Sequence, residues 1–199
     1  VGTPLPAIEF LQQQPRLPAN LELLADIATR AGQMDVALQA WEQLLADPAQ
    51  ATPERAMRAA TLAVVRGKPE LAMAWLEAAR HAVVPGAEIT TDFLRMTGQL
   101  AERQQRDAVA LDAYRQLLTT PDAELPDFDS AIRLLQGDYP LQAADVAMQA
   151  WDRFFQRRHL ILALTTYVSR SQWTQVKHLL DKVSPTTGTA HEAIAPLWK

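Results

Sequence analysis

The chain has 199 residues, of which 48% are hydrophobic and 21% are charged. These values are those of an ordinary globular protein and argue against intrinsic disorder. The formal net charge of −4 does not support nonspecific nucleic-acid binding, which requires a basic stripe. The absence of cysteine excludes disulfides, thiolate catalysis and cysteine-based zinc sites. No apolar run of about 18 residues occurs, so the sequence predicts no membrane span in this segment.

The first predicted helix covers residues 4–14, and we expect residues 1–17 to be an orphan helix that completes a preceding repeat. Asn20 is expected to cap the next helix, which should end at Gly32. A partner helix is predicted over residues 34–46. These two helices form the first predicted pair.

Two further helix pairs follow. The second covers residues 53–66 and 69–81, with Pro at the first position of each helix, where the missing backbone donor does no harm. The third covers residues 90–104 and 107–118. Pro and Gly therefore separate helices rather than interrupt them.

The fourth pair, near residues 122–157, is expected to be irregular. A turn at residues 137–140 leaves a short first helix, residues 128–136, and a long second helix from residue 141 to residue 157. We expect a change of path near residues 122–140. A fifth pair is predicted over residues 160–169 and 173–183, and residues 184–199 form a tail or the start of a further repeat.

The helix pairs repeat a short pattern, in which a small residue is followed four positions later by a large aromatic one. It occurs at Ala37 and Trp41, at Ala110 and Tyr114, and at Ala147 and Trp151. Successive copies lie 35 to 38 residues apart, with Ala72 between the first two. Small residues let helices approach closely, and the aromatic residues fill the space between pairs. The sequence therefore predicts an all-α solenoid of about five helix-turn-helix units over residues 18–183.

This pattern resembles the tetratricopeptide repeat (TPR) family. The resemblance implies that the first helix of each pair lines a concave groove. The implied groove positions are Glu22, Asp26 and Thr29, then Met57, Thr61 and Val64, then Arg95, Gln99 and Glu102. The chaperone-binding subclass holds a peptide carboxylate with Lys and Asn at such positions. Glu22 and Asp26 stand there instead and are expected to repel that ligand.

Charge is unevenly distributed in the second half of the chain. Acidic residues predominate between Asp107 and Asp152, and basic residues predominate from Arg153 to Lys182. Two interpretations are open: ordinary solvated helix surfaces, or a polarised surface that orients a charged partner. On the second interpretation, the contact residues include Asp127, Asp129, Arg157 and Arg158.

Four tryptophans are expected to divide between core and surface. Trp41 and Trp151 occupy the packing position of the repeat and are predicted to be buried. Trp75 lies one place before that position, so we expect it to lean outward. Trp173 opens a helix in the basic region. Trp75 and Trp173 are therefore the aromatic candidates for partner contact.

No catalytic, cofactor-binding or metal-binding motif is complete. His191 and Glu192 begin a zinc-protease motif, but Ala195 stands where its second histidine is needed. Gly67 and Lys68 lack the Ser or Thr of a phosphate-binding loop. The other histidines, His81, His159 and His178, are isolated in sequence and expected at the surface or at helix ends. The sequence predicts no enzyme and no cofactor.

The alanine-rich repeats at residues 37–48 and 147–155 are similar to the periplasmic TPR regions of bacterial Pel-type exopolysaccharide export proteins. The resemblance implies a periplasmic scaffold within a larger outer-membrane protein. It would dock a polysaccharide deacetylase/hydrolase (PelA-like) and guide a cationic polysaccharide toward an outer-membrane barrel. The start at Val1 and the abrupt end at Lys199 fit a segment of a longer chain.

Two alternatives stay open at this point. One is a cytoplasmic TPR adaptor that binds a peptide or a regulatory protein in its groove. The other is a lipid- or peptidoglycan-associated assembly factor. The acidic stretch would suit a cationic polymer, and the basic stretch would suit an acidic protein face.

Overall fold

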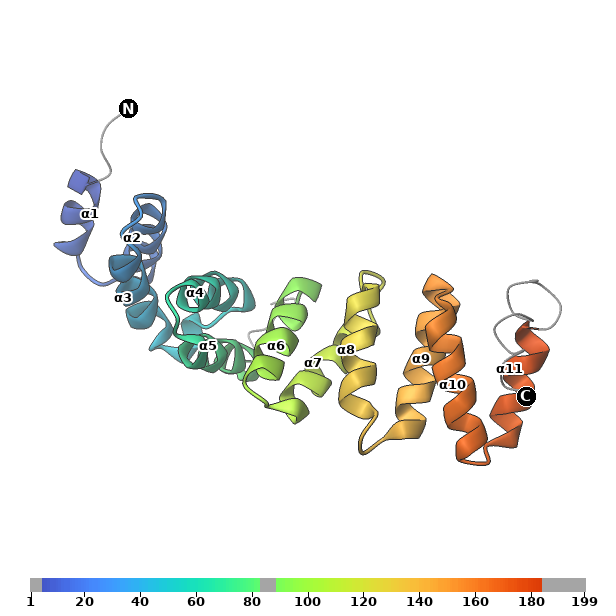
Figure 1. Ribbon diagram of the computed structural model, residues 1–199. Coiled ribbons are helices and arrows are strands. Elements are labelled where there is room, and N and C mark those ends of the chain that lie inside the picture. Colours follow the sequence, from blue (N-terminus) through green and yellow to red (C-terminus); the bar gives the residue numbers. More distant parts are fainter. Residues whose placement is uncertain (1–4, 83–88, 184–199) are drawn as a thin grey trace. The chain divides into compact units, whose positions relative to one another are not determined.

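The computed structural model describes residues 5–82 and 89–183, and these residues form α-helices and one short 3-10 helix with no strand (Figure 1). The all-helical fold predicted from the sequence is confirmed. The helices are α1 (Leu5–Gln12), α2 (Pro18–Arg30), α3 (Met34–Leu45), the 3-10 helix η1 (Pro48–Gln50), α4 (Pro53–Val65), α5 (Pro69–His81), α6 (Thr91–Arg103), α7 (Asp107–Leu118), α8 (Leu125–Leu135), α9 (Pro140–Phe154), α10 (Arg157–Ser169) and α11 (Trp173–Val183).

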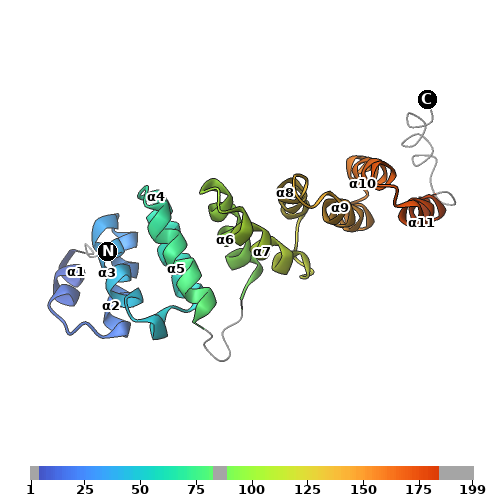
Figure 2. The same ribbon diagram turned by 90° about the horizontal axis from the view of Figure 1, so that it is seen from below.

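The chain forms two compact units, Val1–Gln105 and Arg106–Lys199. In the first unit, α2 packs on α3, α4 on α5, and α6 on both α4 and α5. In the second unit, each helix from α7 to α11 packs on the next one. Figure 2 views α8 to α11 nearly end-on in two rows, with α8 and α10 in one row and α9 and α11 in the other. The second helices of the last two pairs therefore share one side of their unit.

Glycine and proline set the predicted helix limits in the first unit. Pro53 and Pro69 are the first residues of α4 and α5, as expected. Gly32 and Gly67 take the left-handed backbone conformation, with φ of 74° and 69°. The amide after Gly32 donates to the Ala28 carbonyl at 2.8 Å, so the last turn of α2 is closed.

Three helices of the described chain, α2, α8 and α10, each begin three residues earlier than predicted. Pro18 opens α2, so Asn20 is not its cap, and the Asn20 amide instead donates to the Pro15 carbonyl at 2.9 Å. Leu125 opens α8 because Glu124 and Asp127 form a reciprocal capping box, in which each carboxylate accepts from the other residue's backbone amide. The sequence prediction had overlooked this acidic version of the motif.

The long helix α9 ends three residues before the predicted limit. Phe155 adopts a left-handed conformation, with φ of 55°, and stops the helix after Phe154. Its ring lies edge-on to Trp151, with 5.7 Å between the centroids. The predicted change of path near residues 122–140 stays a prediction.

Alanines and large aromatics form the core, as the repeat pattern predicted. Ala25, Ala28, Ala37, Ala56, Ala60 and Ala72 of the first unit are fully buried. Trp41 and Tyr114, each four residues after a buried alanine, are also buried. The core of α8 to α11 includes Leu135, Ala147, Leu160, Leu164, Tyr167 and Leu179, with Trp151 packed against it. Small residues thus permit close helix approach, and large ones fill the space between pairs.

Candidate functional site

Two acids predicted to line the groove are bound by arginines of the next helix pair. Glu22 Oε2 accepts from Arg55 Nε at 3.0 Å and from Arg55 Nη2 at 2.8 Å. Glu22 Oε1 accepts from Arg58 Nη1 at 3.1 Å, and Asp26 accepts from Arg58 Nη2. We call these four side chains, Glu22 and Asp26 of α2 with Arg55 and Arg58 of α4, the α2–α4 junction.

The arginines of the α2–α4 junction are fixed by further contacts. The Arg58 guanidinium lies 5.2 Å from the centroid of the Trp41 ring, and Arg55 Nη1 donates to Gln50 Oε1 at 2.7 Å. Side-chain exposure at the junction is only 24 to 35%. Hydrogen bonds between a guanidinium and a carboxylate are stronger than those between neutral groups. The junction therefore joins two helix pairs and cancels its own charge.

The sequence-based argument about peptide repulsion is corrected by this geometry. It considered Glu22 and Asp26 as unpaired acids, but Arg55 and Arg58 neutralise them. Among the other predicted groove residues, Thr29 and Thr61 donate their hydroxyls to carbonyls of their own helices. The first-helix face of the first unit is thus less acidic than its sequence indicates.

Met57 and Val64 of α4 are half-buried, and three further groove candidates of the first unit lie on α6. Arg95 Nη1 donates to Asp92 Oδ1 at 3.0 Å, one turn earlier on the same helix. Gln99 is exposed, and Glu102 is half-buried. No described contact joins these residues to the α2–α4 junction.

Of the four tryptophans within the described residues, three are placed as predicted and one is not. Trp41 is buried and Trp151 is partly buried against the core, whereas Trp173 is 63% exposed at the start of α11. Trp75 was expected to lean outward, and that prediction is wrong, because the residue is only 7% exposed. It lies on the same face of α5 as Ala72 and Ala79, both buried. Trp173 is the aromatic candidate that reaches solvent.

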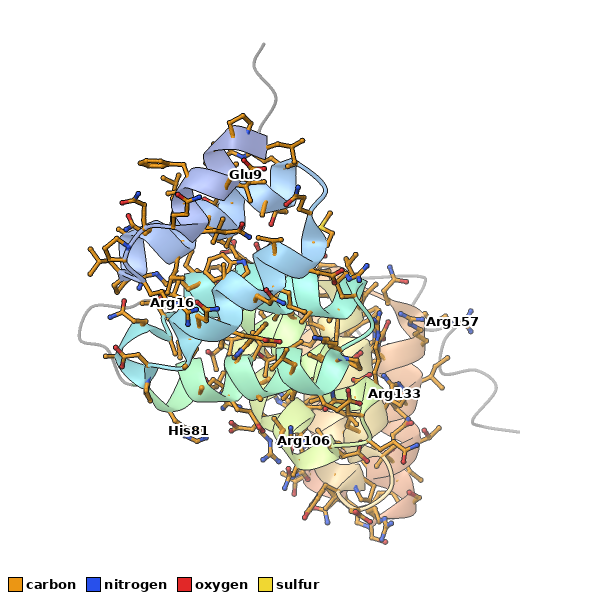
Figure 3. The ribbon with its side chains drawn as sticks, turned by 90° about the vertical axis from the view of Figure 1, so that its left-hand side faces the viewer. Glu9, Arg16, His81, Arg106, Arg133 and Arg157 are labelled. Carbon is orange, nitrogen blue, oxygen red and sulfur yellow. The ribbon has the colours of Figure 1, made fainter. Side chains whose placement is uncertain are left out.

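The charged candidates of the second unit also divide into buried and exposed groups. Asp127 is only 2% exposed and caps α8, so it does not offer its carboxylate to a partner. Asp129 is shared by the exposed Arg158 and by His159, whose Nε2 lies 2.7 Å from Asp129 Oδ1. His159 is 3% exposed and lies in the first turn of α10, so of its two predicted positions, the surface or a helix end, it takes the second. Arg157 lies exposed at the start of α10 (Figure 3).

Sequence reasoning missed a pocket between α9 and α11, which we call the α9–α11 pocket. It encloses about 330 Å³ and is open to solvent. Its lining includes Asp145, Met148 and Asp152 of α9, Tyr167 of α10, and Gln175, His178 and Lys182 of α11. The acids lie seven residues apart, on one face of α9. The spacing of the two acids was the signal for this pocket in the sequence, but α11, which forms the opposite wall, begins about 30 residues after Asp145.

Two polar contacts define the α9–α11 pocket. The Tyr167 hydroxyl donates to Asp145 Oδ1 at 2.6 Å, and Lys182 Nζ donates to both Asp152 carboxylate oxygens at 2.6 Å. Burial raises the pKa of Tyr167 well above its usual range, and the Asp145 carboxylate raises it further. The phenol therefore stays protonated at neutral pH and holds Asp145 in place.

A second hollow lies at the other end of the chain, among α1, α2 and α3. It encloses about 210 Å³ and is rich in side-chain amides, from Gln12, Gln14, Gln39 and Gln43. Arg16, in the segment between α1 and α2, also lines it (Figure 3). These groups are donors and acceptors of hydrogen bonds, and none of them is a nucleophile or a general base of ordinary strength.

Residues 5–82 and 89–183 contain no group of three or more His, Asp or Glu side chains arranged to hold a metal ion. In the same ranges, no helix is both long enough and apolar enough to cross a membrane. The incomplete zinc-protease motif at His191 lies outside the described residues. The described surfaces thus consist of helix faces and open pockets.

A family model described as tetratricopeptide repeat matches residues 43–194. The chain belongs to the tetratricopeptide repeat family. TPR proteins are typically non-catalytic scaffolds for protein–protein interaction, and the helix pairs described above are the structural basis of that role. A search of curated proteins gave no match.

Solved TPR structures share the fold at low sequence identity. YrrB, described as a TPR protein with an unusual peptide-binding site, aligns with a TM-score of 0.59 at 15% identity, over 96% of this chain and 92% of YrrB. MamA aligns with a TM-score of 0.55 at 13% identity, over 89% and 92% of the two chains. The C-terminal part of a TPR protein from Cytophaga hutchinsonii gives 0.52 at 13% identity, over 97% and 75%. These comparisons confirm the TPR-like α-solenoid.

Proposed function

We propose that this TPR scaffold works in bacterial exopolysaccharide export of the Pel type, as part of the periplasmic region of a protein resembling PelB. In this role it docks a polysaccharide-modifying enzyme, a PelA-like deacetylase/hydrolase. The observation that carries the proposal is the pair of alanine-rich, tryptophan-marked repeats at residues 37–48 and 147–155, which resemble those of Pel-type export proteins. Family membership supports the docking role more generally.

The second unit offers the better docking surface for this proposal. Its exposed groups include Trp173, Phe155, Arg157 and Arg158. Aromatic and arginine side chains are enriched at the energetically important centres of protein interfaces. The first unit devotes two arginines to the α2–α4 junction instead.

Guidance of a cationic polysaccharide is the finer part of the proposal. The described acids of the second unit that reach solvent and have no basic partner there include Asp107 and Asp181. Binding through such carboxylates would weaken as salt is added, because exposed charges are screened. Titration of partly deacetylated polymer at low and high salt tests this part separately from enzyme docking.

The docking role is tested by pull-down from periplasmic extract with the chain as bait. The expected result is capture of a carbohydrate-active enzyme, with weaker capture by Trp173→Ala or by Arg157→Glu combined with Arg158→Glu. Leu23→Ala, an exposed apolar position on α2, is the matched control. Capture of cytosolic regulatory proteins alone from whole-cell extract would contradict the export role.

A cytoplasmic adaptor for peptides is the second candidate. The observation that favours it is the similarity in fold to YrrB, which has a peptide-binding site. Fractionation of cells that express the full-length protein separates the two candidates. Recovery in the periplasmic or outer-membrane fraction supports the export role, and recovery in the cytoplasm supports the adaptor.

A further inference from the structure

The α9–α11 pocket has a definite set of walls. Asp145, Met148 and Asp152 lie along one face of α9, and Gln175, His178 and Lys182 lie along α11. Figure 2 places both helices in the same row of the second unit. Tyr167 of α10 also lines the pocket.

The two acids of the α9–α11 pocket differ in their hydrogen-bond and ion-pair partners. Asp152 is paired with Lys182. Asp145 accepts one hydrogen bond, from the Tyr167 hydroxyl, and no basic side chain in the described ranges forms an ion pair with it. The pocket therefore has excess negative charge, and the neutral Tyr167 hydroxyl holds the Asp145 carboxylate in place.

Other polar groups of the α9–α11 pocket are also open to a ligand. Within the part of the chain that the structure describes, Gln175 and His178 make no side-chain hydrogen bond or ion pair. The pocket also has apolar lining from Met148 and Leu179. The lining therefore offers several hydrogen-bond acceptors around an apolar surface.

These features together fit one kind of side chain. An arginine has a three-carbon apolar stem and a planar head with five N–H donors, which suits several acceptors better than a compact ammonium does. A volume of about 330 Å³ is ample for such a side chain. An acidic ligand is disfavoured, because Asp145 would repel it and Lys182 already pairs with Asp152.

We propose that the α9–α11 pocket binds an arginine side chain of a protein partner, with the guanidinium on Asp145 and the stem against Met148 and Leu179. This inference rests on the protein-docking role proposed above and names a site and a chemistry for it. Tyr167 is a positioning residue, since it acts on the ligand only through the Asp145 carboxylate that its hydroxyl orients.

The test is titration of the isotopically labelled 199-residue chain with three short capped peptides, followed by NMR. The peptides carry arginine, lysine or citrulline at one position, because citrulline keeps the shape of arginine and lacks its charge. We expect shifts confined to amides of α9, α10 and α11, and binding of the arginine peptide about tenfold tighter than that of the citrulline peptide.

Variants assign that binding to the pocket. Asp145→Asn keeps an acceptor for Tyr167 and removes the charge, and we expect it to weaken the arginine peptide about tenfold. Asp138→Asn makes the same change of net charge at an exposed acid outside the pocket and should leave binding unchanged. Tyr167→Phe should weaken binding less than Asp145→Asn does.

Several outcomes would overturn the proposal. They are equal binding of arginine and citrulline peptides, equal effects of Asp145→Asn and Asp138→Asn, or shifts that fall mainly outside α9 to α11. Binding of a cationic amino-sugar oligomer in the pocket, without binding of the arginine peptide, would also reject it. The titration contains no export enzyme, so its failure leaves the docking role intact, and a failed pull-down leaves the pocket result standing.

Discussion

The acidic side chains of α2 and Asp145 of α9 differ in the partners that later helices provide. Glu22 and Asp26 each meet an arginine from the next helix pair, and the α2–α4 junction is neutral and half-buried. Asp145 accepts a hydrogen bond from a tyrosine hydroxyl, forms no ion pair within the described residues, and lines a pocket that is open to solvent. Acids of one type are therefore neutralised by arginines in the first unit, whereas Asp145 in the second unit is not.

The comparison shows why local charge in the sequence is a poor measure of surface charge in a repeat protein. The acidic stretch up to Asp152 and the basic stretch after it partly neutralise each other within the second unit. Asp129 pairs with Arg158 and Asp152 pairs with Lys182, at separations of 29 and 30 residues. The charge that an acidic side chain adds to the surface depends on whether the residue about one repeat away is basic.

The largest expected effect comes from removing the aromatic support of the α2–α4 junction. Trp41→Ala removes a buried ring and the surface on which Arg58 lies, so we expect a loss of about 3 to 5 kcal/mol in the free energy of unfolding. Urea unfolding followed by circular dichroism measures it. A loss below about 1 kcal/mol would show that the junction does not depend on this ring.

We expect a smaller loss of stability from breaking an ion pair, and a larger loss at the α2–α4 junction than in the α9–α11 pocket. Arg58→Met keeps the apolar stem and leaves Asp26 without its partner, and we expect a loss of about 1 kcal/mol. The control is Lys182→Met, which breaks a pair whose side chains are 43% exposed and should cost less than about 0.5 kcal/mol. Equal losses in the two variants would contradict the distinction between junction and pocket.

Substitutions at two equivalent turn positions, one in each unit, should change the free energy of unfolding in opposite directions. Gly32 has φ of 74°, so Gly32→Ala should lower the free energy of unfolding by about 1 kcal/mol although no neighbouring atom obstructs the methyl group. Ser171 occupies the equivalent position before α11 with φ of 55°, so Ser171→Gly should raise it by about 0.5 kcal/mol. Thermal unfolding of both variants checks the signs. Stabilisation by Gly32→Ala would refute the assigned conformation.

The smallest effect on stability is expected at Trp173. Its side chain is 63% exposed, so Trp173→Ala should change the free energy of unfolding by less than about 0.5 kcal/mol. Urea unfolding beside Trp41→Ala provides the matched comparison of two tryptophans. A loss comparable to that of Trp41→Ala would mean that Trp173 is a packing residue and not a surface residue available for docking.

The sequence predicted the elements whose causes are local. Proline and glycine fixed the limits of α4, α5 and the turn at Gly32, because each acts on its own backbone. The alanine-to-aromatic step correctly placed Trp41 in the core. The prediction that Trp75 leans outward was wrong because a shift of one residue corresponds to a rotation of about 100° around the helix. The broad apolar face of α5 still includes that position.

The candidate site depended on contacts between repeats, which local patterns do not contain. The burial of His159 against Asp129 was not predicted, because the two residues lie 30 positions apart in the sequence. Arg55 and Arg58 were overlooked for the same reason, being 32 to 36 residues from the acids that they bind. Pairing each acid with bases about one repeat downstream would have found both.

The α2–α4 junction also restricts how such an array can change by gene duplication. The positions 35 residues beyond Glu22 and Asp26 are Met57 and Thr61, so α4 carries the arginines but has no acid at the two equivalent positions. A copied unit inserted between the first two pairs would part the acids from their arginines. These two pairs are therefore not interchangeable modules, and we expect them to be inherited together when the array lengthens or shortens.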